Sequence, residues 1–123
     1  MTLDLIIQNM NDLSQLRSQK LQFVKDLVEG QPVGSPFLVK QSLLATGKTG
    51  KAYLSAVLMD RTGEVDVRAW DNVPKWASLI VPDAFVWVKG KVQVFQGRKQ
   101  IIIEDVEVVR EDAVKSSDFL DPG

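Results

Sequence analysis

A predicted β-hairpin between Gly47 and Trp70 constrains the fold more than any other part of the sequence. Residues 52–59 are mostly apolar, with β-branched and aromatic members, and residues 60–63 (Asp-Arg-Thr-Gly) have the composition of a tight turn. Residues 64–70 then alternate in polarity, so one face of this strand is apolar and the other carries charge and an indole ring. The loop before the first of these strands, residues 47–51, is short, basic and glycine-bearing. The pattern favours a small barrel that lays one sheet face against a polyanion.

Three further strands are predicted, at residues 33–46, 84–95 and 100–110. The first is long, and its hydrophobic phase changes near Gln41, which indicates a strand that bends to serve two sheets. Gly90 marks a bend or bulge in the strand predicted at residues 84–95. A chain of 123 residues is long enough for one domain with its own core.

A short helix is predicted within residues 71–80, between the third and fourth strands. The last strand is expected to carry a bulge near Glu104 and Asp105. Five strands with a helix in that place have the count and order of an OB-type barrel, so the sequence predicts an all-β OB fold. In that fold the second and third strands, together with the loops after the first and fourth strands, form the usual binding surface.

The predicted barrel occupies residues 23–110, with an extension on each side. Residues 1–22 are predicted to form an amphipathic α-helix, and residues 111–123 an acidic flexible tail or linker. The apolar stripe of the helix either packs on the barrel or pairs with its copy in a second chain. The side chains expected at such a contact between chains are Ile6, Met10, Trp87 and Phe95.

Composition excludes several classes of function. The chain has no cysteine and no histidine, which removes disulfides, Cys-based zinc sites, and general bases or triads built on histidine. No Asp/Glu cluster has calcium-loop spacing, so no metal and no cofactor is expected. The N-terminus lacks a signal peptide and no apolar run is long enough for a membrane helix, so a cytoplasmic location is expected.

The net charge of −1 hides an uneven distribution. From residue 33 to residue 100 the chain has 10 basic and 5 acidic residues, a balance of +5. The two ends together have 5 basic and 11 acidic residues, a balance of −6. The predicted barrel is therefore basic and its flanks are acidic, and a local basic surface is what a phosphate backbone requires. The alternative is that the basic and acidic residues are separated along the chain by chance.

The residues predicted to contact nucleic acid lie on the outward face of the second and third strands and in two basic loops. They are Lys48, Lys51, Tyr53, Ser55, Arg68, Trp70, Arg98 and Lys99. Aromatic rings can stack on bases, and the cations can meet phosphate. Asp66, on the same face, argues against a continuous anion groove. The structural alternatives are that Trp70 closes one end of the core, that Tyr53 is an ordinary half-exposed strand residue, and that the loop cations are only solvated.

Several motifs resemble the N-terminal OB domain of YhaM-type bacterial 3′→5′ exoribonucleases. They comprise Phe23-Val24-Lys25-Asp26-Leu27, Pro36-Phe37-Leu38-Val39-Lys40, Gly50-Lys51-Ala52-Tyr53-Leu54-Ser55, Asp60-Arg61-Thr62-Gly63-Glu64, Trp70-Asp71, Val88-Lys89-Gly90-Lys91-Val92 and Gln96-Gly97-Arg98. The resemblance covers about residues 21–120. The Gly-Lys and Asp-x-Thr-Gly core alone is also similar to OB modules of replicative polymerases and aminoacyl-tRNA synthetases.

The resemblance implies a domain that binds single-stranded nucleic acid, RNA in preference to DNA, and presents it to a separate nuclease domain. That family carries its metal-dependent chemistry in a following His-Asp domain, and this chain has no histidine. We therefore expect an isolated OB domain that is not itself an enzyme. The alternative is a protein-interaction module that self-assembles through the N-terminal helix and the outer face of the barrel.

Overall fold

The computed structural model describes residues 17–120. Its strands are β1 (Pro32–Thr46), β2 (Ala52–Asp60), β3 (Gly63–Ala69), β4 (Phe85–Phe95) and β5 (Arg98–Val109). Its helical elements are η1 (Val24–Asp26), α2 (Val73–Leu79), η2 (Glu111–Ala113) and η3 (Ser116–Asp118). In this part of the chain, no helix has the length and apolar character needed to span a membrane. The predicted N-terminal helix, with Ile6 and Met10, lies outside the described residues.

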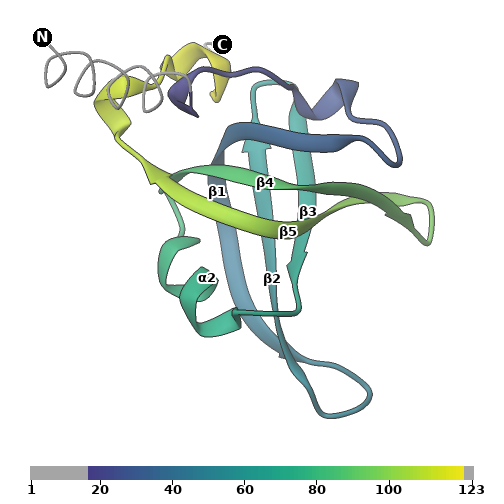
Figure 1. Cartoon of the computed structure of the whole chain (residues 1–123). Coiled ribbons are helices and arrows are strands. Elements are labelled where there is room, and N and C mark those ends of the chain that lie inside the picture. The colour runs from purple at the N-terminus through teal and green to yellow at the C-terminus, as the bar shows by residue number, and fades with distance from the viewer. Residues whose placement is uncertain (1–16, 121–123) are drawn as a thin grey trace, which may run out of the picture.

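The strands close into a barrel in the order β1-β2-β3-β5-β4, and Figure 1 shows β4 and β5 crossing in front of the other three. The long strand β1 pairs with β4 through residues 32–38 and with β2 through residues 38–46. Its register with β2 shifts between Val39 and Gln41, where the sequence predicts a phase change. β3 and β5 run parallel and close the barrel through a short pairing. The predicted five-stranded OB barrel is confirmed.

The alternating strands build the core. β2 buries alternate residues from Leu54 to Leu58, and β3 does the same from Val65 to Ala69, so these side chains point into the barrel while their neighbours face outward. The short helix α2 covers one end of the barrel, because Trp76 within it and Ile80 just after it are both buried in the core cluster.

The β4–β5 hairpin extends beyond the barrel (Figure 1). Its tip is the two-residue turn Gln96-Gly97, both with positive φ (52° and 79°), which is the arrangement of a type I′ turn between paired Phe95 and Arg98. The register shifts between Lys89 and Gly90, as the bulge predicted near Glu104 requires. Because residues 93–99 are exposed, this hairpin can form a wall beside the barrel surface.

A buried ion pair stabilises the end of the barrel opposite α2. Lys20 Nζ lies 3.1 Å from Asp60 Oδ2, and the two side chains are 1% and 0% exposed. The ammonium also donates to the Pro36 carbonyl at 2.7 Å and lies 3.3 Å from the Phe37 ring centroid. Asp60 accepts from the backbone N–H of Val24. The pair therefore joins the segment before β1 to the end of β2.

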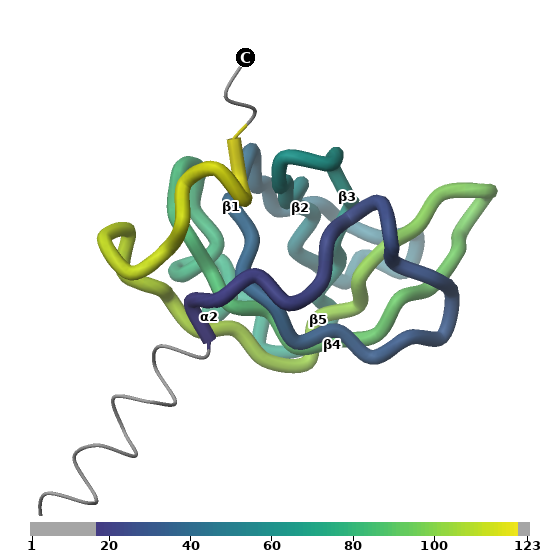
Figure 2. Tube along the Cα trace, turned by 90° about the horizontal axis from the view of Figure 1, so that it is seen from above, coloured from purple at the N-terminus to yellow at the C-terminus, as the bar shows by residue number. Residues whose placement is uncertain are grey.

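The segment after β5 differs from the expected flexible tail as far as Leu120. Phe119 is fully buried against Phe85, edge to face with ring centroids 5.1 Å apart, and the backbone N–H of Arg61 donates to the Asp118 carbonyl. Figure 2 looks down on this end, with the yellow C-terminal segment near the purple lead-in. Within the described residues, the polar segment after β5 is thus attached to the barrel by one buried aromatic ring.

Candidate nucleic-acid interface

The outward faces of β2, β3 and β5 form one continuous surface. In the registers of β2, β3 and β5, Ser55 pairs with Arg68 and Arg68 with Ile102. The next row on the same face contains Asp66, which pairs with Gln100. Since paired residues in register point to the same side of a sheet, the outward residues of β3 continue directly onto β5.

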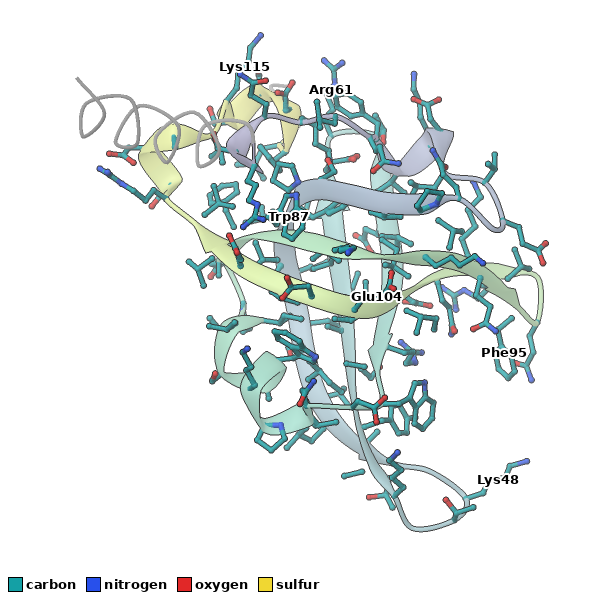
Figure 3. The ribbon with its side chains drawn as sticks, viewed as in Figure 1. Lys48, Arg61, Trp87, Phe95, Glu104 and Lys115 are labelled. Carbon is teal, nitrogen blue, oxygen red and sulfur yellow. The ribbon has the colours of Figure 1, made fainter. Side chains whose placement is uncertain are left out.

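A groove of about 590 Å³ lies on this surface. Three parts of the chain line it: the β1–β2 loop, the outward face of β2 and β3, and the β4–β5 hairpin. The lining residues are Gly47, Lys48, Tyr53, Asp66, Arg68, Trp70, Gln93, Phe95, Gln96, Arg98, Gln100 and Ile102. Figure 3 shows Lys48 on the β1–β2 loop and Phe95 near the tip of the β4–β5 hairpin, so the groove lies between two projecting loops.

Aromatic rings stand on both sides of the groove. Tyr53 and Trp70 stack with centroids 4.4 Å apart and an interplanar angle of 29°. Trp70 is 41% exposed and outside the buried core, so it does not close the core as the alternative supposed. Gly47 in the β1–β2 loop lies beside the indole ring, since a Cβ there would be in ordinary contact with it at 3.7 Å. Phe95 is 56% exposed on the facing hairpin.

Three of the predicted cations line the groove: Lys48, Arg68 and Arg98. Arg68 donates to the Val67 carbonyl at 2.9 Å, which holds its side chain against the sheet. Arg98 Nε lies 3.9 Å from Asp66 Oδ2, a long ion pair in which the arginine side chain is 78% exposed. The groove therefore combines π-faces with positive charge.

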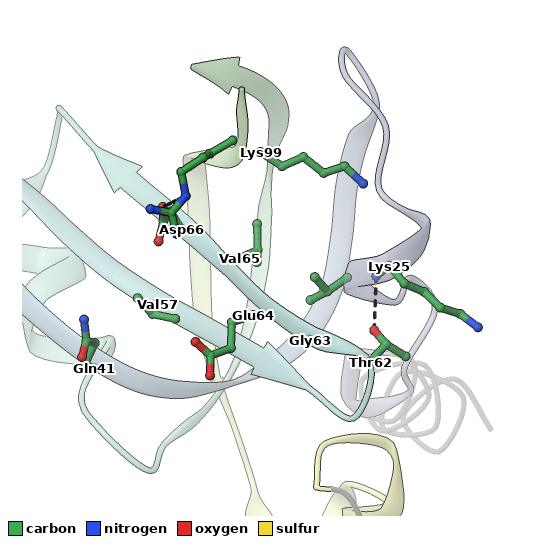
Figure 4. Close-up of a pocket in the computed structure, with 11 residues that line it drawn as sticks. Lys25, Gln41, Val57, Thr62, Gly63, Glu64, Val65, Asp66 and Lys99 are labelled. Carbon is green, nitrogen blue, oxygen red and sulfur yellow. Dashed lines mark hydrogen bonds and ion pairs between the residues drawn. The ribbon is translucent and has the colours of Figure 1, made fainter. Parts of the chain in front are cut away.

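The other predicted contacts lie elsewhere. Lys51 pairs with Asp71 at 3.8 Å and does not line the groove, and neither does Ser55, which lies on the outward face of β2. Lys99 lines a second cleft of about 680 Å³ beside the β2–β3 turn. In Figure 4 its side chain extends toward the segment that carries Lys25. Asp66 and Arg98 line both the groove and this cleft.

Two residues predicted as contacts between chains have separate surroundings. Trp87 packs beside the Phe85–Phe119 cluster and lies under the Arg17 guanidinium, 4.4 Å from the ring centroid. Phe95 lines the groove instead. Figure 3 shows the two residues far apart along β4. Since they do not share a surface, a contact between chains through both of them stays a prediction without structural support.

Sequence reasoning did not select several groove residues as nucleic-acid contacts. They are Phe95, which it assigned to a contact between chains, and three glutamines, Gln93, Gln96 and Gln100. Alternation along β4 places Phe95 outside the barrel, but it does not show that the hairpin tip faces β3. The basic turn Gln96–Lys99 is the signal that could have found them, because residues next to a predicted binding loop share its surface. Among residues 17–120, no group of three or more acidic side chains could hold a metal ion.

Comparison with known proteins agrees with this geometry. The tRNA anti-codon family model, an OB-fold nucleic acid binding domain, matches residues 39–109, more than half of the chain. The 3′-5′ exoribonuclease YhaM of Geobacillus sp. is 33% identical over 93 residues, covering 75% of this chain and 29% of that protein. YhaM of Listeria monocytogenes is 31% identical over 97 residues, covering 78% and 31%. The chain thus spans about three tenths of the length of these relatives.

Solved structures share the fold at low sequence identity. A replication protein A domain from Methanococcus maripaludis has a TM-score of 0.59 at 19% identity, covering 72% of this chain and 94% of that one. The mitochondrial single-stranded DNA binding protein Rim1 of S. cerevisiae has a TM-score of 0.57 at 9% identity, covering 68% and 97%. The family model and the YhaM relatives show that the chain belongs to the family of OB-fold nucleic acid binding domains, and its resemblance to the OB region of YhaM exoribonucleases is confirmed.

Proposed function

We propose that the groove binds single-stranded nucleic acid, RNA in preference to DNA, and holds it for a nuclease domain separate from residues 17–120. The observation that carries the proposal is the groove itself, where the Tyr53–Trp70 stack faces Phe95 across a channel with three cations. Bases stack on aromatic faces with little regard to sequence, and the cations neutralise phosphates. A duplex buries its base faces, so this arrangement favours an unpaired strand.

The preference for RNA and the role in presenting substrate rest on the relatives. Those matched proteins are named 3′-5′ exoribonucleases, and this chain matches less than a third of their length. The chain has no histidine, and we propose that cleavage belongs to the part of such proteins that this chain does not match. The groove would then raise the residence time of the substrate near that part.

Fluorescence anisotropy with labelled oligo-uridine and oligo-deoxythymidine tests the proposal. We expect binding to both, tighter to oligo-uridine. Trp70→Ala should weaken binding about 5- to 150-fold, because one base–ring stack is worth about 1–3 kcal/mol. Val108→Ala is the matched control, since Val108 is an exposed β5 residue that does not line the groove. No binding at tens of micromolar protein in low salt, or equal affinities of the wild type and Trp70→Ala, would contradict the proposal.

A further inference from the structure

The groove contains an acid where a purely electrostatic site would have none. Asp66 points outward from β3, its side chain is 21% exposed, and it lines the same groove as Lys48, Arg68 and Arg98. A carboxylate repels the phosphates that these cations attract. The nearest cation, Arg98, is 3.9 Å away and largely exposed, so it is free to leave the carboxylate for a phosphate. The position of Asp66 therefore suits a group other than phosphate.

Gln100 lies next to Asp66 in the register of β3 and β5. This glutamine is only 9% exposed and lines the groove. Among residues 17–120, neither its amide nor the Asp66 carboxylate has a hydrogen-bond partner, although Asp66 has its long ion pair with Arg98. In the described part of the chain no side-chain polar atom is both buried and unpaired, so the amide and carboxylate atoms of this pair are open to the groove. Two neighbouring side chains thus offer free acceptors and donors to whatever enters the groove.

The pair offers a defined pattern of hydrogen-bonding atoms. An ionised carboxylate presents two acceptor oxygens, and an amide presents a donor beside an acceptor. The Watson–Crick edge of guanine has two adjacent donors, the N1–H and the 2-amino group, followed by the O6 acceptor. The two donors match the carboxylate, and O6 matches the amide NH₂. Adenine, cytosine and uracil each place a ring nitrogen lone pair or a carbonyl oxygen beside their single donor, which a carboxylate repels.

We infer that Asp66 and Gln100 read the Watson–Crick edge of a guanine held in the groove by the aromatic rings. This inference rests on the proposed function, and it replaces uniform binding with a preference at one nucleotide. Single-stranded bases are commonly recognised in this way, by stacking on rings and hydrogen bonding at their edges. Asp66 and Gln100 are then specificity residues, while Tyr53, Trp70 and Phe95 supply affinity for any base.

Competition binding measures the preference. The competitors are oligo-uridine and the same oligomer with a single central guanosine, adenosine, cytidine or inosine. We expect the guanosine oligomer to bind about 10-fold more tightly than oligo-uridine. Inosine should fall between them, because it keeps N1–H and O6 but lacks the 2-amino group. One guanosine per oligomer prevents the strands from assembling into quadruplexes.

Two substitutions assign the preference to the pair. Asp66→Asn should abolish the advantage of guanosine while binding of oligo-uridine is retained, and Gln100→Leu should reduce that advantage. Glu64→Gln is the matched control, because Glu64 is a β3 acid that pairs with Lys40 and lines the second cleft rather than the groove. It should leave the guanosine advantage unchanged. Thermal melting verifies that each variant is folded.

The outcomes separate the inference from the proposed function. Equal affinities for all five oligomers, with binding intact, would overturn the inference and leave the proposed function standing. An Asp66→Asn variant that binds every oligomer more tightly by the same factor would also overturn it, because the carboxylate would then act only as a charge. Failure of the wild type to bind any oligomer would overturn both.

Discussion

Lys20 is charged, buried and paired, and its pKa reflects the balance between these conditions. Burial lowers the pKa of Lys20 from 10.5 to about 8, although Asp60 and Asp118 nearby raise it. Burial alone would raise the pKa of Asp60, but hydrogen bonds from Thr62 and from the Val24 N–H, together with the Lys20 ammonium, hold it below its ordinary value. The stability contributed by Asp60 is therefore present above about pH 4 and lost as the pH falls through its lowered pKa.

The Lys20→Met substitution should reveal this balance through the pH dependence of stability. Because the folded-state pKa of Lys20 lies below its unfolded value, its charged form costs stability at and below pH 8. That cost is relieved as the pH rises from about 8 to 10.5, so the wild type should gain up to roughly 3 kcal/mol relative to the variant over this range. Urea denaturation at several pH values measures the difference in unfolding free energy.

Lys25→Met serves as the control, since Lys25 is exposed and it is its backbone N–H that donates to Thr62 Oγ1. The difference between this control and the wild type should not change between pH 8 and 10.5. If Lys20→Met and the wild type instead keep a constant difference in that range, the buried lysine does not titrate there.

At the scale of elements, the close pairing of β4 with β5 depends on Gly90. A Cβ at this position would overlap the carbonyl oxygen of Ile102 and lie 2.9 Å from Ile101 Cγ2. The overlapped atom belongs to the backbone, so the two strands would have to separate. Gly90→Ala should therefore lower the unfolding free energy by about 1–3 kcal/mol, the usual cost of overpacking.

Gly34→Ala is the matched control for this prediction. Gly34 lies on β1, beside the residue that pairs with Gly90, and a Cβ there would meet only the Trp87 ring at an ordinary 3.8 Å. Chemical denaturation of both variants gives the comparison. Equal stability of Gly90→Ala and Gly34→Ala would show that β4 and β5 are not in close contact.

The elements were predictable where their signal is local. Period-two alternation placed β2, β3 and most of β4, and glycine marked the bulge, because the causes lie within a few residues of each other. The packing of Phe119 on Phe85 and the pairing of Lys20 with Asp60 were not predictable, since each joins residues that are distant in sequence. For the same reason local alternation selected Tyr53 on β2 and Trp70 just after β3 as candidates, whereas Phe95, which lines the same groove, was assigned to a different surface.

For the whole molecule, the segregation of charge predicts how binding responds to salt. Lys48→Gln should reduce the slope of log K against log salt concentration by about 0.7, the value for one phosphate contact on a single strand. Lys75→Gln removes the same charge from α2, where Lys75 does not line the groove, and should leave the slope unchanged. Anisotropy titrations at four salt concentrations provide both slopes. Equal slopes for the two variants would mean that net charge, rather than the groove, governs binding.

The pairing of β3 with β5 closes the barrel, and a ligand in the groove would stabilise this pairing. Three residue pairs, from Asp66–Gln100 to Arg68–Ile102, form this parallel seam, while the antiparallel pairings around the ring are longer. The groove lies over this pairing, so a bound nucleic-acid strand would contact residues of both β3 and β5 and hold the two strands together. Local opening of the seam would dismantle the binding surface, and by thermodynamic linkage an occupied surface resists that opening. The pairing of β3 with β5 would therefore open less often when nucleic acid is bound than when the groove is empty.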